Sequence, residues 1–498
     1  MNIIKSQQQK LFEVKADLIA IGAFNTKDGF ELRDEDGGSE LDKHLNAKIS
    51  NLLKEEGFRA DKNSFRLIPA LGLLSAQYLL VVGLGDTKKL SLDDIRMSGG
   101  VIAKQATVCK AKEVAFVLES AQLANTGESL RLEALLTGLL LGQYRFDRYK
   151  KKIDDLYPQK VEVLTALDEK GLSKALESAS ITALSQNMAR TLSNTPANDL
   201  TPFGLVEVAK RIEKEFDTIK CEIWDKKRLA EERMNLVLAV AKGSAEDPYL
   251  IKLQYKPQKS SKKIALVGKG VVFDSGGLSL KSSDNMEDMK TDMEGGAIVL
   301  AVMKAIGKLK PDVEITAYIP AVENMPDGAA VRIGDVITAR NGTTVEMTNT
   351  DAEGRLIMAD ALALAVETKP DLIIDVATLT GSALAALGQN YTVMLGNDQS
   401  SIEAFKKACS TAGEKVWQLP LEEEYKEDLT KGIADIKNSV KSKGQTIIAA
   451  LFLHEFVGST PWIHLDIASN HCADDKIPIM KKGSSGRMTR SLIQFLRG

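Results

Sequence analysis

Cysteine is scarce in this sequence, which contains only four among its 498 residues. Cys109, Cys221, Cys409 and Cys472 include no C-x-x-C pair, so the sequence signals neither a thiolate zinc site nor a disulfide framework. We interpret each cysteine as a small buried apolar residue. A protein stabilised mainly by disulfides or by cysteine-bound zinc is therefore not expected.

Histidine is equally scarce, with four residues, and none lies near the glycine- and aspartate-rich motifs described below. His454, His464 and His471 fall within 18 residues, a spacing that a metal cluster would permit. Packing or surface roles are the preferred interpretation, and a pocket contact for His471 is the main exception. Histidine is the commonest metal ligand in proteins, so the absence of histidine from these motifs argues against a histidine-built metal site.

The sequence also lacks long apolar runs and an excess of charge of one sign. No stretch reaches about 18 consecutive apolar residues, and residues 1–17 are too polar for an export signal. We therefore expect a cytoplasmic protein with no membrane partner. The 65 Lys and Arg nearly balance the 68 Asp and Glu, so a dedicated nucleic-acid binder is not indicated, although a local basic patch remains compatible with this balance.

What is present is a regular alternation of short apolar runs and helical patterns. This alternation predicts an α/β fold, and the length predicts about two to four domains. In the first part, strands are expected at 17–22, 78–83 and 113–117 and helices at 92–109 and 130–144. In the second part, strands are expected at 264–268, 313–319 and 372–376, and helices at 294–309, 356–367, 446–456 and 489–495.

These patterns divide the chain into two α/β domains. We predict an N-terminal domain with a mixed sheet over residues 1–160 and a helical connector over 161–193. A larger C-terminal domain over 194–498 would have a central, mostly parallel sheet flanked by helices. The two prolines around residues 194–202 support this division, because Thr201 followed by Pro202 is a good helix start.

Polar residues of chemical interest follow a predicted buried strand. Lys269 and Asp274 come directly after residues 264–268, and ligands of α/β sheets collect at the carboxyl ends of strands. Several glycines around them allow the backbone to turn sharply and to approach a site closely. Further along, Asp351 and Glu353 are two residues apart, so both side chains would point to one face of an extended segment.

Together with Asp292, these residues bring four negative charges that are costly unless they are neutralised. Two divalent cations would balance them, and carboxylate oxygens suit Mg²⁺, Mn²⁺ or Zn²⁺. The available nitrogen donor is Lys269, which must lose its proton before it can bind a metal. Neighbouring cations can lower a lysine pKa far below its usual value of about 10.4.

The run Asn-Thr-Asp-Ala-Glu-Gly-Arg-Leu at 349–356, with Lys269, Asp274, Lys281 and Asp292 at these spacings, resembles the leucine aminopeptidase (cytosol aminopeptidase) family. The specific motifs lie within 268–381. A looser resemblance covers about 195–498 well and the N-terminal domain in outline. The resemblance implies a cytoplasmic metallo-exopeptidase that removes the N-terminal residue of peptides, preferably Leu or another apolar residue, and assembles as a homohexamer.

The resemblance also implies two metal ions, Mn²⁺ or Zn²⁺, with a water between them as nucleophile. One ion would be held by Lys269, Asp274, Asp292 and Glu353, and the other by Asp274, Asp351 and Glu353. Lys281 would bind the substrate and stabilise the oxyanion, and Arg355 would hold a bicarbonate ion that shuttles protons. Residues that match the pocket for the first side chain are Met289, Asn349, Thr378, Leu379, Gly381 and Ala468.

The sequence departs from the family pattern at three places. Ile333 stands where proline is frequent, Glu294 stands where a small residue is usual, and residues 469–471 (Ser-Asn-His) replace a more apolar stretch at the pocket wall. The last departure leaves the preferred first residue open. The charges of Asp284, Glu287 and Asp288, close to the metal motif, are interpreted as solvated.

Two alternative functions, nucleotide-dependent catalysis and DNA binding, belong to other functional classes. A nucleotide-dependent enzyme would need a complete phosphate-binding loop, but Gly83-Leu-Gly85 lacks the third glycine of a dinucleotide fingerprint and is interpreted as a turn. A DNA-binding regulatory role, in addition to peptidase activity, is known for some bacterial members of the resembled family. Salt-dependent retention on duplex DNA would distinguish it.

Overall fold

The structure is a computed structural model that describes residues 2–6, 10–33, 38–117, 126–153, 155–260 and 262–498. The chain forms two compact units, each built on its own β-sheet. The first comprises Met1–Leu184 with Asp474–Lys482, and the second comprises Ser185–Ala473 with Gly483–Gly498. The prediction of two α/β domains is confirmed. Among the described residues, no helix is both long and apolar enough to cross a membrane.

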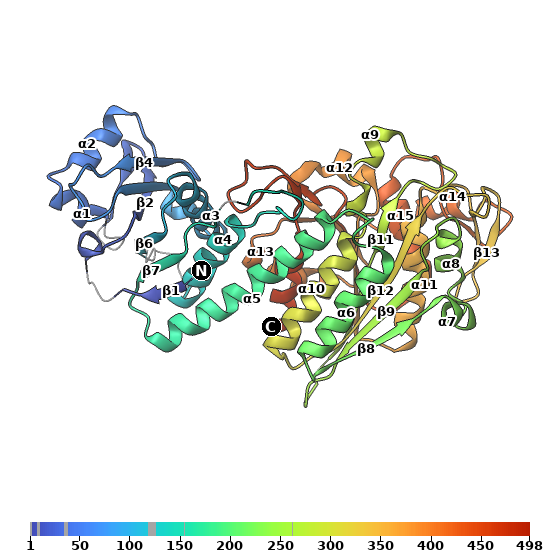
Figure 1. The fold of residues 1–498 in the computed structure, drawn as a ribbon. Coiled ribbons are helices and arrows are strands. Elements are labelled where there is room, and N and C mark those ends of the chain that lie inside the picture. The colour runs from blue at the N-terminus through green and yellow to red at the C-terminus, as the bar shows by residue number, and fades with distance from the viewer. Residues whose placement is uncertain (1, 7–9, 34–37, 118–125, 154, 261) are drawn as a thin grey trace. The chain divides into compact units, whose positions relative to one another are not determined.

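The first unit contains a mixed sheet (Figure 1). Its described strands run in the order β1 (Asn2–Lys5), β7 (Lys160–Leu164), β6 (Glu113–Val117), β2 (Leu18–Thr26), β5 (Tyr78–Gly85) and β4 (Phe65–Pro69), with β3 (Gly29–Glu31) paired to β2. The neighbours from β1 to β5 are parallel, whereas β4 and β3 pair antiparallel with β5 and β2. The predicted connector over 161–193 therefore begins inside a strand of this sheet.

Successive residues of a strand point to opposite faces of the sheet, and in this sheet the side chains on both faces are apolar. Both faces are therefore covered. Leu18 and Ala20 face one cluster, with α3 (Leu92–Val108) and α4 (Glu128–Gly142), whereas Ile19 and Ile21 face the other. The second cluster contains residues of α1 (Gly38–His44) and α2 (Lys48–Glu55). The long helix α5 (Glu169–Asn194) follows, and the division between the two units falls within it.

The second unit is built on a larger sheet. Its strands run in the order β17 (Val416–Gln418), β16 (Thr392–Gly396), β19 (Trp462–Asp466), β15 (Leu372–Ala377), β10 (Lys263–Gly268), β12 (Glu314–Asn324), β9 (Tyr249–Tyr255) and β8 (Ile219–Trp224). A further strand, β11 (Gly270–Asp274), pairs with the far end of β12. The centre, from β19 to β12, is parallel, and antiparallel pairs occur toward both margins. The predicted mostly parallel central sheet is confirmed.

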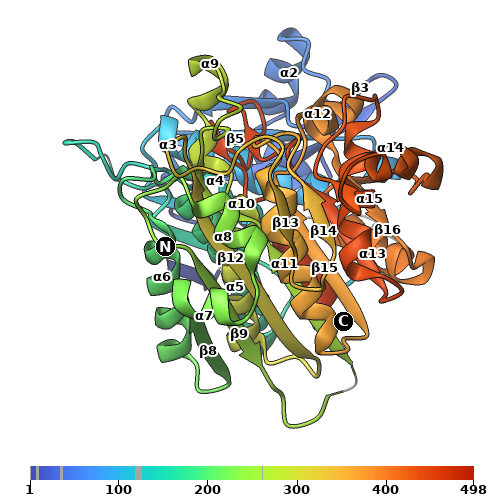
Figure 2. The ribbon, with the colours of Figure 1, turned by 90° about the vertical axis from the view of Figure 1, so that its right-hand side faces the viewer.

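Helices cover both faces of this sheet (Figures 1 and 2). On one face lie α6 (Pro202–Glu215) and α10 (Glu294–Leu309), and on the other lie α8 (Asn235–Ala241), α11 (Glu353–Glu367) and α15 (Gln445–Val457). As predicted, α6 begins at Pro202, and the Thr201 hydroxyl accepts from Gly204 N as its N-cap. Nearly every residue of α10 and α11 is buried, which agrees with their apolar sequences.

The first turn of α10 packs directly on the carboxyl ends of the central strands. Gly296 N donates to Lys269 O at 2.7 Å, just beyond the end of β10. A Cβ on Gly295 would lie only 2.1 Å from Val376 O in β15, so only glycine permits this approach. Because Gly268 is in register with Val376, and Ala377 with Asp466, the segments after β10, β15 and β19 leave the sheet at one edge. The predicted site residues gather at this edge.

Candidate metal centre

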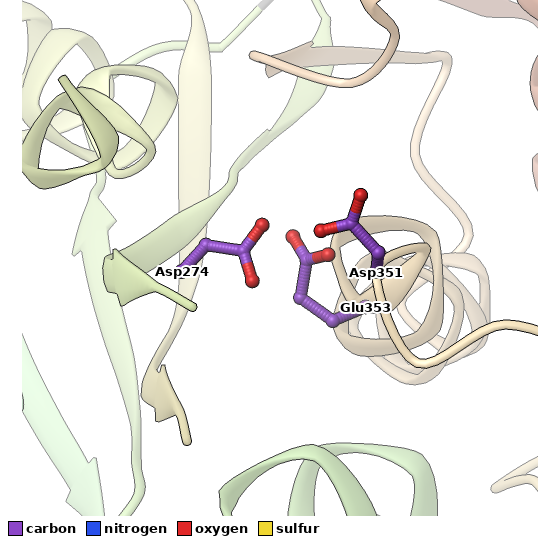
Figure 3. Close-up of side chains that lie close together, drawn as sticks. All are labelled: Asp274, Asp351 and Glu353. Atoms are coloured by element: carbon purple, nitrogen blue, oxygen red, sulfur yellow. The ribbon is translucent and has the colours of Figure 1, made fainter. Parts of the chain in front are cut away.

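Three carboxylates converge at this edge of the second sheet. Asp274 ends β11, Glu353 begins α11, and Asp351 lies in the turn before that helix. One oxygen from each lies within 4.8 Å of the other two, and Figure 3 shows the carboxylates pointing toward one another. The backbone at Asp351 and Glu353 is not the expected extended segment, because the chain turns into α11 there. The turn nevertheless brings both carboxylates to the same place.

Two lysines pair with these carboxylates, and one of them, Lys269, also pairs with Asp292. Lys269 Nζ lies 2.6 Å from Asp292 Oδ1 and 2.8 Å from Glu353 Oε1, and it donates to Thr378 O at 2.8 Å. Lys281 Nζ lies 2.8 Å from Asp274 Oδ2 and also contacts Asp351 Oδ1. The five residues predicted as metal ligands and Lys281 thus form one connected cluster.

In this cluster, burial and the attraction between opposite charges shift the pKa values of the side chains in opposite directions. Burial disfavours the charged form of Lys269, but the carboxylates of Asp292 and Glu353 outweigh it and raise the lysine pKa. Burial and the neighbouring Glu353 charge raise the pKa of Asp274 to about 6, and burial raises the pKa of Asp292 well above its ordinary value. Ionisation of all four carboxylates beside two ammonium groups would leave an excess of negative charge, which a cation would neutralise.

The donor set fits divalent metal ions. Among the described residues, the buried Asp292 Oδ2 has no hydrogen-bond partner, and Glu353 Oε1 forms an ion pair with Lys269 Nζ at 2.8 Å but no hydrogen bond. Unpaired carboxylate oxygens are costly in a protein interior, and oxygen ligands are those that Mg²⁺, Mn²⁺ and Zn²⁺ accept. A cation beside these carboxylates would also oppose the charge on Lys269, and the neutral amine is a nitrogen ligand.

The orientation of the carboxylates is fixed by further hydrogen bonds. Asp274 Oδ1 accepts from Asn324 Nδ2 at 2.8 Å and from Gly276 N at 2.9 Å. Asp292 Oδ1 accepts from the Thr378 hydroxyl at 2.7 Å. Our sequence reasoning missed Asn324, although its position at the carboxyl end of β12 was a usable signal.

Gly354 keeps open the space that the Lys269 side chain crosses. A Cβ on Gly354 would lie 2.5 Å from Lys269 Cε and 2.7 Å from Nζ. The glycine between Glu353 and Arg355 in the motif is therefore explained by a close side-chain approach in the first turn of α11.

Arg355 lies beside the cluster and is buried. Its Nη1 donates to Asn438 O at 2.8 Å, whereas its Nε donates to no group in the described part of the chain. Burial lowers the Arg355 pKa to about 10, against the opposing effects of the Glu353 and Asp466 carboxylates. Asn438 also donates to Asn349 O at 2.6 Å and was missed, because no motif surrounds it in the sequence.

The predicted pocket residues lie in segments around the same edge. Met289 begins the short 3₁₀ helix η3 (Met289–Thr291) that leads to Asp292, and Gly381 begins α12 (Gly381–Leu387). Asn349 lies just before Asp351, and its side chain accepts from Asp351 N at 2.9 Å. A Cβ on Gly381 would meet open space.

Asp466, at the end of β19, joins two more of these segments. It accepts from Leu379 N and from Ala468 N, both at 3.1 Å, and from the Thr380 hydroxyl at 2.7 Å. The structure therefore brings the Thr378–Leu379 segment and Ala468 together. Our sequence reasoning missed Asp466, which belongs to a run that is otherwise apolar or aromatic.

Asp284, Glu287 and Asp288 are exposed, as the interpretation of solvated charges requires. His464 is buried and bonds Asp375, and His454 stacks on Trp462. His471 is half-buried, and its Nδ1 lies 2.9 Å from Ala468 O. The three histidines therefore form no common metal site among the described residues.

Comparison with known proteins adds the following similarities. The model of the cytosol aminopeptidase family catalytic domain matches residues 187–493, and that of the family's N-terminal domain matches residues 20–153. A protein of Solibacter usitatus named "Probable cytosol aminopeptidase" is 42% identical over 426 residues, which cover 84% of this chain and 86% of that protein. A protein of the same name from Sulfurihydrogenibium sp. is 37% identical over 492 residues, covering 98% of this chain and 96% of that protein.

Solved structures are also similar over almost the whole chain. A mutant of tomato leucine aminopeptidase has a TM-score of 0.90 and 31% identity, with coverage of 100% of this chain and 96% of that one. The bottromycin maturation enzyme BotP in complex with Mn has a TM-score of 0.85 and 32% identity, with coverage of 97% and 99% respectively.

Proposed function

Because the chain belongs to the cytosol aminopeptidase family and is a metal-dependent aminopeptidase, we propose that it removes the N-terminal residue of peptides, with a preference for Leu or another apolar residue. The connected cluster of four carboxylates and two lysines carries this proposal. A cluster with a purely structural role would be expected to balance its charges. This one has four carboxylates for two lysines, and Asp292 Oδ2 has no hydrogen-bond partner among the described residues.

The proposed site holds two divalent ions, Mn²⁺ or Zn²⁺. One set of ligands is Lys269, Asp274, Asp292 and Glu353, and the other is Asp274, Asp351 and Glu353. When bound, such a pair of ions supplies Lewis acidity that lowers the pKa of water and polarises a carbonyl group. The protein holds the shared carboxylates in place, and the bonds from Asn324 and Gly276 to Asp274 support this role.

Lys281 is the proposed stabiliser of the oxyanion that forms on the scissile carbonyl. Its side chain is 14% exposed, so it borders the more open part of the cluster, whereas that of Lys269 is 3% exposed. Asp274 and Asp351 hold the ammonium group and, against the effect of burial, raise its pKa, so it stays charged. A fixed positive charge at this place stabilises developing negative charge in the transition state.

Arg355 is the proposed holder of a bicarbonate ion. The unpaired Nε supports this role, because a buried guanidinium N–H without a partner is available to an anion. Bicarbonate would supply a base of suitable strength, and Arg355 would fix its position beside Glu353. Activity in carbonate-free buffer should therefore rise on addition of bicarbonate in the wild type, and an Arg355→Ala variant should not respond.

Selectivity for a free N-terminus is assigned to the buried side of the cluster, around Lys269 and Asp292. The first side chain would enter the pocket formed by Met289, Asn349, Thr378, Leu379, Gly381 and Ala468. Most of these residues offer apolar or small surfaces and no countercharge, so Leu and Met should be better first residues than Asp or Glu.

The test is kcat/KM for matched peptides with free and acetylated N-termini. We expect the acetylated forms to be nearly inert, chelation to abolish activity, and Mn²⁺ or Zn²⁺ to restore it. Activity should rise through mildly alkaline pH, because a free α-amine becomes neutral near pH about 7.7–8.0. Equal cleavage of free and acetylated peptides would contradict the proposal.

The family resemblance also supports a cytosolic homohexamer, and the relatives' names support the cytosolic location. Large apolar side chains such as Ile333 and Ile433 are exposed in the single chain and are candidates for subunit contacts. Light scattering of the active enzyme tests the assembly, and a fully active monomer would rule it out.

A further inference from the structure

His471 presents a hydrogen-bond acceptor that the protein itself does not use. Its Nδ1 lies 2.9 Å from Ala468 O, and a carbonyl oxygen can only accept, so Nδ1 carries the ring proton. In the neutral ring, Nε2 then has a free lone pair. Within the described residues, Nε2 has no hydrogen-bond partner.

A series of hydrogen bonds and neighbouring residues connects His471 with Lys269 of the metal cluster. Lys269 donates to Thr378 O, and the backbone N–H of the next residue donates to Asp466. Asp466 also accepts from Ala468 N, and Ala468 O is the partner of the His471 ring. His471 thus belongs to the same edge of the sheet as the buried lysine.

The ring is neutral near pH 7. Burial lowers the His471 pKa, and the Lys269 charge lowers it further, while the Ala468 carbonyl and the carboxylates of Asp288 and Asp466 act in the opposite direction with a smaller total effect. This agrees with the tautomer that the Ala468 contact requires.

Glu294 indirectly fixes the segment that carries His471. Gly486 N donates to Glu294 Oε1 at 2.7 Å, and the Ser193 hydroxyl donates to Oε2 at 3.2 Å. The neighbouring Ser485 N donates to His471 O at 2.6 Å. Glu294, which stands where the family usually has a small residue, is buried and holds Gly486, next to the residue that bonds the backbone of His471.

The rest of the segment is equally constrained. Ser469 donates from its hydroxyl to Tyr391 O at 2.6 Å, and Asn470 donates from its amide to the Thr392 hydroxyl at 2.9 Å. A segment held by these hydrogen bonds loses little conformational freedom when a ligand binds. A hydrogen bond to His471 Nε2 would therefore be preorganised.

From this geometry we propose that His471 is a specificity-determining residue whose Nε2 accepts a hydrogen bond from the first side chain of the substrate. The proposal rests on the proposed function. It predicts that His471 raises the rate for side chains that end in an N–H or O–H donor relative to apolar side chains of equal size. Met289 and Ala468 still receive the carbon part of the side chain, so Leu and Met remain substrates.

The experiment compares kcat/KM for dipeptides that share a second residue and begin with Gln, Met, Asn or Leu. Gln and Met are similar in size, as are Asn and Leu, so each ratio isolates the donor group. In His471→Met and His471→Leu variants, we expect both ratios to fall about tenfold relative to wild type, the effect of one neutral hydrogen bond. The two variants differ in shape, so folded protein from either one is sufficient.

Two controls separate specificity from general damage. His471→Gln restores an acceptor and should recover most of the ratio, whereas His454→Met, on α15, should leave the ratio unchanged. Metal content and thermal unfolding are measured on each variant. Ratios that stay within about twofold of wild type in folded His471→Met or His471→Leu protein would overturn the proposal. A wild type that cleaves none of the dipeptides would instead overturn the proposed function.

Discussion

Lys269 Nζ and Asp292 Oδ1 lie 2.6 Å apart, with side chains that are only 3% and 7% exposed. Removing one partner of such a pair leaves a buried charge without compensation, which typically costs about 3–5 kcal/mol. We therefore expect Lys269→Met to lower the free energy of unfolding of chelator-treated protein by that amount. Urea unfolding at pH 7 measures the difference.

The matched control for this variant is Lys263→Met, at the exposed start of β10, where a surface change typically alters stability by less than about 0.5 kcal/mol. Lys269→Met should also bind less metal than wild type. Equal unfolding free energies for Lys269→Met and Lys263→Met would contradict a buried ion pair in the metal-free protein.

Lys281→Ala should separate catalysis from metal binding. If Lys281 stabilises the oxyanion, its loss should reduce kcat by about 10²–10³ and leave the metal content at the wild-type level. Elemental analysis and kinetics on the same preparation provide the measurement, with the exposed Lys443→Ala as control. If Lys281→Ala and Lys269→Ala lose metal to the same extent, the two lysines do not have the separate roles proposed here.

Gly354→Ala should weaken metal binding although it removes no ligand atom. The new Cβ would displace the Lys269 side chain, which Asp292, Glu353 and Thr378 hold in place. Alanine within a helix is otherwise favourable by roughly 0.5–1 kcal/mol, so α11 itself should not lose stability. Calorimetric titration with Mn²⁺ should show lower affinity for this variant and no change for Gly328→Ala, where a Cβ meets open space. Unchanged affinity in Gly354→Ala would show that Lys269 can move without effect on the site.

The His464–Asp375 pair should make stability depend on pH. Burial opposes the charge on His464, but Asp375, 2.6 Å from Nδ1, outweighs it and raises the pKa above its ordinary value. Unfolding releases this proton, so the stabilisation is complete below pH about 6.5 and is lost as pH rises through the folded pKa. The free energy of unfolding, measured from pH 6 to 9, should fall more steeply in wild type than in Asp375→Asn. Parallel curves would mean that His464 is neutral in the fold throughout.

The residues that the sequence revealed share a simple physical signal. Lys269 and Asp274 follow buried apolar strands, and the carboxyl edge of a parallel sheet is where such residues meet, so their cluster could be predicted. Asp466 and His464 could not, because they are buried polar residues within a strand whose pattern gives no reason to expect their partners. Asn438 lies next to a strand of only two residues, and its contacts to residues 348–349 and 355 depend on tertiary folding alone.

The groups that surround the Lys269 amine come from distant parts of the chain, with Thr378 109 positions further along. Asp466, which accepts from the residues that follow Thr378, lies almost ninety positions beyond that. A ribosome must therefore have released most of the second unit before these groups can meet, since such loops close only when both ends exist. The nascent chain therefore has no complete active site for most of its synthesis. The order of residues along the polypeptide delays the enzyme's destructive chemistry until the protein is nearly finished.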